Sequence, residues 1–431
     1  MNDEKRNDKE SKVAGRLRQL IKANQSLAHI ESLEGLLPEL LDLVRDVTGA
    51  EASSLLLYDP ERNVLKFAAV RDEFLGEKAD EILKNAVELK MGEGIAGWVA
   101  ENRQSINIED AQSDSRWFKE ADKKTGFITR NLLCIPLLYK EEILGVINVL
   151  NCKDKPYFDA EDQEILESFA DLGAVAIIRS RLLETRLKQQ KMEIQLEAAS
   201  KIQSLFWPNI PKLGEGSYAW AVSIPAAFVG GDLYDMIPLP DGDWLVYVAD
   251  VSDKGLSAAL IMAALSTRIR SEVPLHNEVD KLLEAVNRDV YDLMSEEGFF
   301  ATIILGKYSP KTGKMQFALG GHFPPVWIGK DGSGHIPKVK GISLGISPEA
   351  KYGKEEITLS SGESILFMTD GITEAENEQD ELFGNNRLLE FIEKTQGPPW
   401  GEGLLGVVKE WRGRKQANDD TTLMEIWREP K

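Results

Sequence analysis

The sequence predicts two folded domains of different class, an α+β domain and an α/β sandwich, with a long helix between them. Three observations predict this arrangement. Up to about residue 178 the pattern runs helix, strand pair, glycine-rich turn, strand pair and helix. From residue 160 to 206 the pattern is helical with no internal proline, and beyond it strand patterns alternate with helical ones. A chain of 431 residues has room for two or three such modules.

Composition excludes several classes of protein. The formal net charge of −20 would repel a phosphate polymer, so nucleic acid is not expected as a partner. The longest apolar stretches, Leu132–Leu138 and Ile143–Leu150, are shorter than the roughly 18–20 residues of a membrane span, and no span is predicted. Residues 1–12 are a charged run without the apolar segment of a secretory signal, and only Cys134 and Cys152 are cysteines. These features favour a cytoplasmic protein.

Residues 1–29 are predicted to form an N-terminal helical segment that leads into a first domain over 30–178. Apolar residues recur at helical spacing in the N-terminal segment and again from Leu36 to Val47, where Thr48-Gly49 supplies a stop. Two antiparallel strand pairs follow, each closed by a short polar turn. These are Ser53–Tyr58 with Val64–Val70, and Leu132–Tyr139 with Ile143–Leu150.

Two segments of this domain resemble those of a GAF domain. They are Met91-Gly92-Glu93-Gly94-Ile95-Ala96-Gly97-Trp98-Val99, with glycines around a short helix, and the closing Tyr157-Phe158-Asp159-Ala160-Glu161-Asp162. The resemblance covers residues 30–178. It implies a sensor domain that receives a signal, either a small molecule or a protein.

The GAF members that bind cyclic nucleotides carry Asn-Lys followed at a distance by Phe, three residues and Asp-Glu. Phe158 and Asp162 match that pattern, but other positions depart from it: Cys152 separates Asn151 from Lys153, and Gln163 stands where Glu is expected. This departure argues against nucleotide binding. Phe158 and Asp162 are interpreted instead as a hydrophobic staple and a cap at the start of a helix.

Residues 179–206 are predicted to be a helical linker that forms a coiled coil. Apolar side chains lie near a 3,4 repeat with one polar residue among them, which is typical of a parallel two-helix coil between identical chains. They are Leu183, Leu187, Gln190, Ile194, Ala198, Ile202 and Leu205. A homodimer is therefore expected, and the alternative is a helix packed on its own domain.

A second domain is predicted over 207–431, because Trp207-Pro208-Asn209-Ile210-Pro211 ends the helix. Many strands with a few helix pairs predict an α/β sandwich. The strand patterns are Trp244–Ala249, Thr302–Tyr308, Met315–Leu319, Pro325–Ile328, Ser364–Met368 and Thr422–Trp427. The helical patterns are Ser257–Ser271, Val279–Met294, Arg387–Lys394 and Leu404–Arg412.

Four segments of this domain place aspartate at the edge of a strand beside residues that allow close backbone approach. They are Val229-Gly230-Gly231-Asp232-Leu233-Tyr234-Asp235, Ala249-Asp250-Val251-Ser252-Asp253, Met368-Thr369-Asp370-Gly371 and Asn418-Asp419-Asp420-Thr421. Taken singly, each is typical of a turn. Together they would bring several carboxylates to one rim of a sheet, where cations must neutralise them. Hard oxygen ligands favour Mg²⁺ or Mn²⁺, and the scarcity of cysteine and histidine argues against zinc.

These motifs resemble the SpoIIE-type branch of the protein phosphatase 2C family, the metal-dependent serine/threonine phosphatases, over roughly 198–428. The resemblance also rests on Lys201-Ile202-Gln203 and Gly320-Gly321-His322-Phe323-Pro324-Pro325. With a GAF domain in front, the chain resembles RsbU-like regulators of bacterial partner switching. The resemblance implies a phosphorylated STAS-domain anti-sigma-factor antagonist as substrate.

The resemblance also implies a ligand set for two divalent ions. Asp250 would bridge the two ions. Asp232 and the Val251 carbonyl would complete one, Asp370 and Asp419 would hold the other, and Asp420 is a less favoured ligand. Two such ions activate a water that attacks phosphorus in line, so the protein supplies no nucleophile.

The sequence does not decide the roles of three further residues. Asp235 either orients a metal-bound water or is a turn residue. Asp253 stands where relatives carry glycine, which adds a negative charge near the site. His322 is a candidate general acid, but a lone histidine in a turn is more often structural, and it is left out of the catalytic set.

Two other functions are compatible with the same motifs. A two-metal nucleotidyl cyclase also uses paired aspartates, but no base-recognition pocket is evident near them. A catalytically silent domain that binds a partner is the other, and the presence of every expected ligand argues against it.

Overall fold

The structure is a computed structural model that describes residues 25, 30, 32–73, 81–84, 87–395 and 397–430. The helical segment predicted over 1–29 lies outside these residues, apart from residue 25. The chain divides into two compact units, the first ending at Gln190 and the second beginning at Lys191. The two units are described one at a time.

The first unit is built on one six-stranded antiparallel sheet with the order β3-β2-β1-β6-β5-β4. Its strands are β1 (Ala50–Asp59), β2 (Val64–Asp72), β3 (Glu88–Lys90), β4 (Ile106–Ile108), β5 (Leu132–Tyr139) and β6 (Glu142–Cys152). Its helices are α2 (Leu33–Thr48), α4 (Gly94–Asn102), α5 (Lys119–Thr125) and the first part of α6 (Ala160–Gln203). Both predicted strand pairs are present; the three-residue strands β3 and β4 were too short to leave a periodic pattern.

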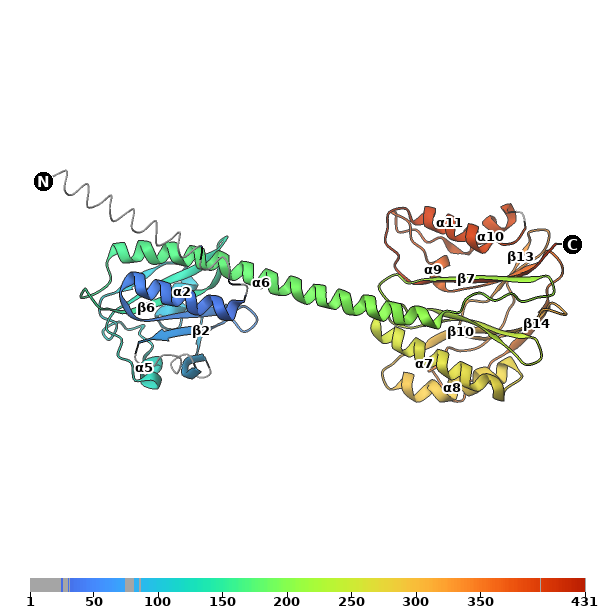
Figure 1. Ribbon diagram of the computed structural model, residues 1–431, viewed down its shortest axis with the longest axis horizontal. Helices are drawn as coiled ribbons and strands as arrows, with labels where there is room; N and C mark the ends of the chain where they lie inside the picture. The colour runs from blue at the N-terminus through green and yellow to red at the C-terminus, as the bar shows by residue number, and fades with distance from the viewer. Residues whose placement is uncertain are drawn as a thin grey trace. The chain divides into compact units, whose positions relative to one another are not determined.

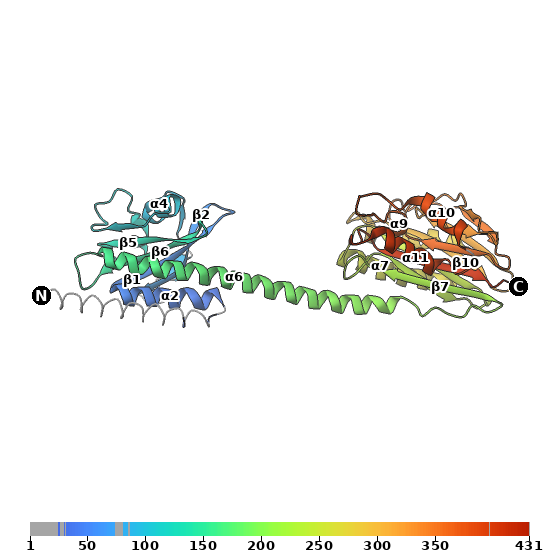
Figure 2. The same cartoon turned by 90° about the horizontal axis from the view of Figure 1, so that it is seen from above.

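Both faces of this sheet are buried, because successive side chains of a strand point to opposite faces. Leu55 of β1 packs in a core with α2 and α6, whereas its neighbour Leu56 packs in a second core with α4. Figure 2 shows α2 and α6 along one side of the sheet and α4 on the other. The second of these cores contains a cavity, described below.

The start of α6 carries the cap predicted from the sequence. The Asp162 carboxylate accepts from the Asp159 backbone N–H at 2.9 Å, and the Asp159 carboxylate accepts from the Asp162 N–H at 3.1 Å. This reciprocal pair satisfies two amides that a helix start leaves without a helical partner. Phe158, just before it, is fully buried in the first core. The interpretation of Asp162 as a cap is confirmed, while the staple at Phe158 stays a prediction.

The predicted long helix is present as α6, which has 44 residues and belongs to both units. Its first turns are buried against the sheet of the first unit, and from residue 182 to 195 every residue is exposed. A short 3₁₀ turn, Ser204–Phe206, follows it, and Trp207-Pro208 ends the helical stretch. No helix in the described ranges has the length and apolarity needed to cross a bilayer.

The second unit is a sandwich of two five-stranded antiparallel sheets, with the orders β14-β11-β10-β9-β8 and β13-β12-β15-β16-β7. The strands of the first are β8 (Leu233–Pro238), β9 (Trp244–Val251), β10 (Ala301–Ser309), β11 (Lys314–Gly320) and β14 (Lys354–Thr358). Those of the second are β7 (Ser217–Ile224), β12 (Val326–Ile328), β13 (Gly334–His335), β15 (Ser364–Met368) and β16 (Thr421–Arg428).

Helices cover the outer face of each sheet, which confirms the α/β sandwich. The helices are α7 (Leu256–Glu272), α8 (Val279–Ser295), α9 (Asp370–Thr373), α10 (Gly384–Lys394) and α11 (Gly401–Arg412). Apolar side chains of the two sheets meet between them, among them Val248 and Phe367. The pair α7 and α8 packs on one sheet, and α10 and α11 pack on the other (Figure 1). The sequence patterns missed β8, because it follows a glycine pair and carries Asp235 in its middle.

Candidate metal centre

The antiparallel order of the strands carries the four aspartate motifs to one end of the sandwich. In one sheet Leu233 at the start of β8 pairs with Ala249 near the end of β9, so Asp232 is brought beside Asp250. In the other sheet Met368 at the end of β15 pairs with Leu423 near the start of β16, which places Asp370 beside the residues preceding β16. Since β15 and β16 pack against β9, the two rims face each other.

Direct contacts join the two sheets at this rim. The Thr369 hydroxyl, on the second sheet, donates to the Asp232 carboxylate on the first at 2.8 Å. The Asp232 and Asp250 carboxyl groups are near enough to shift each other's pKa. Asp370 and Asp419 act on Asp250 through their charges. The structure therefore brings Asp232, Asp250, Asp370 and Asp419 to the same end of the sandwich.

Burial and mutual repulsion raise the pKa of three of these carboxyl groups. Burial is the largest cause for Asp232, which is 2% exposed, and the charge of Asp250 adds to it. For Asp250 the cause after burial is the charge of Asp370 and then that of Asp419. For Asp370 burial comes first, followed by Glu374 and Asp419. A divalent cation relieves this kind of repulsion.

Two glycines let the chain pass close to this cluster. A Cβ built on Gly231 would lie 2.6 Å from the Val251 carbonyl oxygen, and one on Gly371 would lie 1.8 Å from the backbone oxygen of Asp420. Contacts that short are possible only without a side chain. The glycines beside Asp232 and Asp370 thus have a steric reason to be there, which the turn interpretation of each motif did not supply.

The donor set fits a hard divalent cation. It consists of carboxylate oxygens with the Val251 carbonyl oxygen close to Gly231, and such oxygen ligands suit Mg²⁺ or Mn²⁺. In the part of the chain that the structure describes, however, no three Asp, Glu, His or Cys side chains are close enough together to form a ligand group. The assignment of individual ligands therefore stays a prediction.

Two residues outside the predicted ligand set, Asp420 and Lys254, support the cluster. The Asp420 carboxylate accepts from the backbone N–H groups of Ala226 and Gly231, both at 2.7 Å, so it anchors the glycine pair ahead of Asp232. Lys254 forms an ion pair with Asp419 at 3.2 Å. These contacts link residues some 165–195 positions apart, and no local sequence pattern could have revealed them.

The last residue of α6 also reaches this region. The Gln203 side chain donates to the Gly230 carbonyl at 2.6 Å and accepts from the Gly230 N–H at 3.1 Å. Gln203 is 4% exposed. A primary amide that pairs with both backbone polar groups of one residue fixes that residue in position. The end of the linker helix is therefore bonded two residues away from Asp232.

Asp235 is not a turn residue, contrary to one of the two alternatives. It lies inside β8, fully buried, and its carboxylate pairs with the Arg270 guanidinium of α7 at 2.7 Å. It also accepts from the Tyr247 hydroxyl at 3.4 Å. This ion pair attaches the C-terminal part of α7 to the sheet, in addition to the packing of the apolar face of α7.

Asp253 follows the cluster on the exposed loop between β9 and α7. Its φ of 74° lies in the left-handed region, which glycine adopts without strain. The backbone therefore explains why a glycine would suit this position. No interaction of the Asp253 carboxylate is found among the described residues that explains its presence.

His322 is a buried, neutral side chain. The Thr302 hydroxyl lies 2.6 Å from its Nδ1, and its Nε2 is buried without a hydrogen-bond partner among the described residues. Burial lowers the pKa of the imidazole to about 4. A histidine that is neutral at pH 7 lacks the acidic imidazolium proton that a general acid gives to a leaving group. This agrees with its exclusion from the catalytic set.

Family models match both units. Residues 31–178 match the model described as "GAF domain", and residues 240–429 match the model described as "Stage II sporulation protein E (SpoIIE)". Thus the chain has a GAF domain followed by a SpoIIE-type domain.

Curated relatives resemble parts of the chain. "Phosphoserine phosphatase RsbU" of Bacillus subtilis (strain 168) is 28% identical over 193 residues, which are 44% of this chain and 56% of RsbU. "Probable 3',5'-cyclic phosphodiesterase pde-5" of Caenorhabditis elegans is 29% identical over 185 residues, which are 41% of this chain and 25% of that protein. The matches thus span about half or less of these relatives' length.

A solved structure, the "SiaA-PP2C domain of Pseudomonas aeruginosa", superposes on this chain with a TM-score of 0.50 and 21% identity. The match covers 56% of this chain and 98% of that one. At this level of identity the likeness concerns the fold alone, and it agrees with the two-sheet sandwich described above.

The state of His322 predicts a pH dependence of stability. The unfolded chain binds a proton at this residue below about pH 6.5, while the folded chain does so only near pH 4. Stability should therefore fall as the pH drops through this interval, by about 2 kcal/mol between pH 7.5 and pH 5 from this residue. Urea unfolding of wild type and His322→Gln, followed by tryptophan fluorescence at both pH values, measures the difference. An equal loss in both proteins would contradict this assignment.

Proposed function

We propose that this chain, with its GAF domain followed by a SpoIIE-type domain, is a metal-dependent phosphatase of phosphoserine or phosphothreonine proteins. The observation that carries the proposal is the convergence of Asp232, Asp250, Asp370 and Asp419 at one end of the sandwich. The similarity to a curated phosphoserine phosphatase over 193 residues supports it.

The proposed ligands are those that the resemblance to the SpoIIE-type phosphatases implies, and the interactions of Asp250 support them. Asp250, which interacts with all three other carboxylates, would bridge two ions. Asp232 and the Val251 carbonyl would hold one ion, and Asp370 and Asp419 the other. When bound, two Mn²⁺ or Mg²⁺ ions supply an activated water and neutralise charge on the phosphate oxygens.

The remaining residues of the site position these ligands. Thr369 donates to Asp232 and keeps one carboxylate oxygen facing the second sheet. Asp420, bonded to backbone amides, is engaged in holding the glycine pair, which explains its lower suitability as a ligand. Lys254 neutralises part of the charge at Asp419. A nucleophile from the protein is not needed for this chemistry.

The proposed substrate is a phosphorylated STAS-domain anti-sigma-factor antagonist, and the proposed setting is the cytoplasm. Both follow from the resemblance to RsbU-like partner-switching regulators. A signal received by the GAF domain would then set the activity, with α6 as the element that transmits it. The contacts of Gln203 with Gly230 support this role, because they link α6 to the segment that carries Asp232.

Removal of a central carboxylate should abolish hydrolysis. We expect Asp250→Ala and Asp370→Ala to lower Mn²⁺-dependent release of phosphate from an aryl phosphate and from a phosphoserine protein at least 100-fold. They should also weaken Mn²⁺ binding in calorimetry. Asp241→Ala, at the opposite end of β9 on an exposed loop, is the matched control and should retain full activity.

Wild-type activity in the Asp250 and Asp370 variants would overturn the assignment of the site. Formation of a cyclic nucleotide from ATP or GTP by the wild type would favour the cyclase alternative. A wild type that binds no Mn²⁺ and hydrolyses neither substrate would favour a silent binding domain.

Loss of the Gln203 contacts should impair the site without removing a ligand. We expect Gln203→Ala to lower kcat or the apparent Mn²⁺ affinity about 10-fold, since Gly230 loses both partners. Ser204→Ala is the control, because the exposed Ser204 hydroxyl bonds only to the Lys201 carbonyl within the same turn. If wild type and Gln203→Ala had identical kinetics, α6 would not control the site through Gln203.

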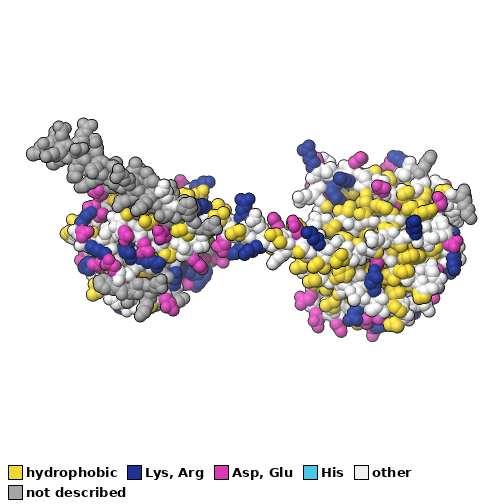
Figure 3. All heavy atoms as spheres, viewed as in Figure 1, with side chains coloured by type: hydrophobic (Ala, Val, Ile, Leu, Met, Phe, Trp, Pro, Cys, Tyr) yellow, Lys and Arg dark blue, Asp and Glu magenta, His cyan; other side chains and the backbone are white. Residues whose placement is uncertain are grey.

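The exposed part of α6 supports the proposed homodimer. Apolar side chains project from it into solvent among charged ones (Figure 3). They include Leu183, Leu187, Ile194 and Ile202, of which all but Leu183 are more than half exposed. A second copy of the helix would cover this stripe, since its spacing is near that of a two-stranded coil.

Charges placed on the stripe should separate the dimer. We expect wild type to sediment as a dimer and the double variant Leu187→Glu with Ile194→Glu to sediment as a monomer at the same micromolar concentration. Gln189→Glu adds charge at an exposed polar position of the same helix and should leave the dimer intact. A monomeric wild type would refute the dimer while leaving the catalytic assignment in place.

A further inference from the structure

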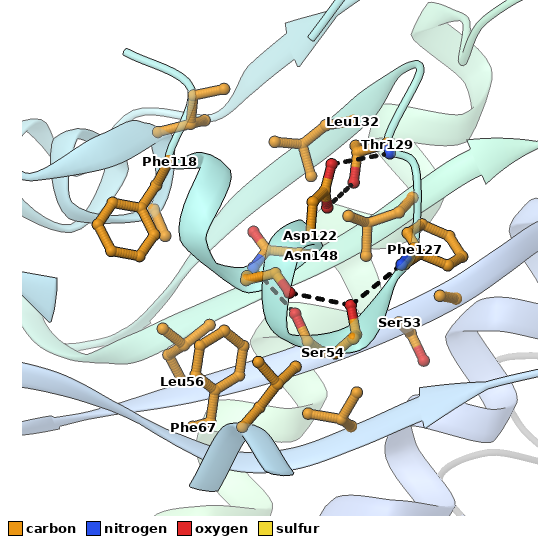
Figure 4. Close-up of a pocket in the computed structure, with 18 of the residues that line it drawn as sticks. Ser53, Ser54, Leu56, Phe67, Phe118, Asp122, Phe127, Thr129, Leu132 and Asn148 are labelled. Atoms are coloured by element: carbon orange, nitrogen blue, oxygen red, sulfur yellow. Dashed lines mark hydrogen bonds between the residues drawn. The ribbon is translucent and has the colours of Figure 1, made fainter. Parts of the chain in front are cut away.

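The second core of the GAF domain encloses a cavity beneath α4 and α5 (Figure 4). Side chains of β1, β2, β5 and β6 form its floor, and apolar groups make most of its wall. They include Leu56, Phe67, Ile95, Phe118 and Leu132. The space in it that the centre of a water molecule can occupy is about 90 Å³. This is the same order as an engineered apolar cavity of about 150 Å³ that holds one benzene molecule, so the ligand should be about one ring in size.

Two polar groups in this cavity have no partner among the described residues. Asn148 of β6 is 7% exposed, its amide nitrogen donates to the Ser54 hydroxyl at 3.1 Å, and its Oδ1 is unpaired. The Nε1 of Trp117, which also lines the cavity, is buried and unpaired as well. An unmade hydrogen bond at a buried polar atom costs roughly 1–3 kcal/mol. A ligand whose polar group forms a hydrogen bond with one of these two atoms would recover that energy.

The charge of the wall selects against anions. No Lys, Arg or His is among the described residues that line the cavity, whereas Asp72 and Asp122 are. The Asp122 carboxylate is held by Thr129, whose hydroxyl donates to it at 2.8 Å and whose N–H donates at 3.1 Å (Figure 4). A phosphate buried beside the Asp122 carboxylate, with no cation among the described wall residues, would be strongly disfavoured.

The residues that resemble a cyclic-nucleotide motif are used elsewhere in the fold. The Asn151 amide donates to the Glu51 carboxylate at 2.8 Å and to the Ile128 carbonyl at 2.9 Å. Asp162 caps α6. Neither is among the residues of the cavity wall. Size, charge and the missing motif thus all argue against a nucleotide.

We propose that this cavity binds an uncharged, monocyclic aromatic ligand that carries a hydroxyl group, with the hydroxyl on the Asn148 amide. A hydroxyl both donates and accepts, so it satisfies either orientation of that amide. The ring contacts the aromatic and aliphatic wall. The inference deepens the sensor role proposed above and rests on it only for its regulatory consequence, because binding is measured without reference to catalysis.

Calorimetric titration of the full chain with p-cresol tests the proposal, with toluene, benzoate and cyclic GMP as comparison probes. We expect p-cresol to bind in the micromolar to millimolar range. Toluene, which lacks the hydroxyl, should bind roughly 5- to 10-fold more weakly. Benzoate and cyclic GMP should not bind at the same concentrations. No binding of p-cresol, or tighter binding of either anion, would overturn the proposal.

Two variants locate the site. Asn148→Leu should remove the advantage of p-cresol over toluene, and continued binding of toluene shows that the variant is folded. Ala121→Phe, on the half-buried α5, should fill the cavity and lower the affinity for both neutral probes at least 10-fold. An unchanged preference for p-cresol in Asn148→Leu would refute the role of the amide. Phosphatase activity without any probe is measured in parallel. An inactive enzyme is thereby distinguished from a cavity that binds no ligand.

Discussion

The repulsion among buried carboxylates at one end of the sandwich is the constraint on which the catalytic unit depends. Asp232 and Asp250 are brought together because β8 and β9 are antiparallel neighbours, and Asp370 faces them because the second sheet packs on the first. Burial alone would make such groups unfavourable as ions. The Thr369 hydroxyl donates a hydrogen bond to Asp232, and a divalent cation would relieve the remaining repulsion.

Two further hydrogen bonds connect the segment ahead of Asp232 to α6. Gln203 at the end of α6 binds both polar groups of Gly230, and the next residue, Gly231, is held by the Asp420 carboxylate. A displacement of α6 would therefore act on the backbone just before Asp232 rather than on a distant surface. Packed helices and sheets often have discrete alternative arrangements. A small shift of α6 can therefore change the geometry of the whole carboxylate cluster.

The feature of the GAF domain that requires an explanation is the cavity in its core. Its sheet is buried on both faces, and the face beneath α4 and α5 is left with a cavity into which Asn148 brings a polar atom that no described residue satisfies. Such a group is expensive unless something pairs with it. No described residue of the wall is cationic, and Asn151 and Asp162 make structural contacts outside the cavity, so this pocket differs chemically from one for nucleotides.

The sequence by itself was sufficient for features that depend on local periodicity or turn chemistry. These include the long helix, the cap of Asp159 and Asp162, the main strand pairs and the aspartates at strand ends. Only the tertiary structure decided which groups meet across the fold: Asp235 with Arg270, Gln203 with Gly230, and Asp420 with the amide of Gly231. The reason is that a pattern reports the few residues around it, whereas the partner of a buried polar group is set by how whole sheets and helices pack.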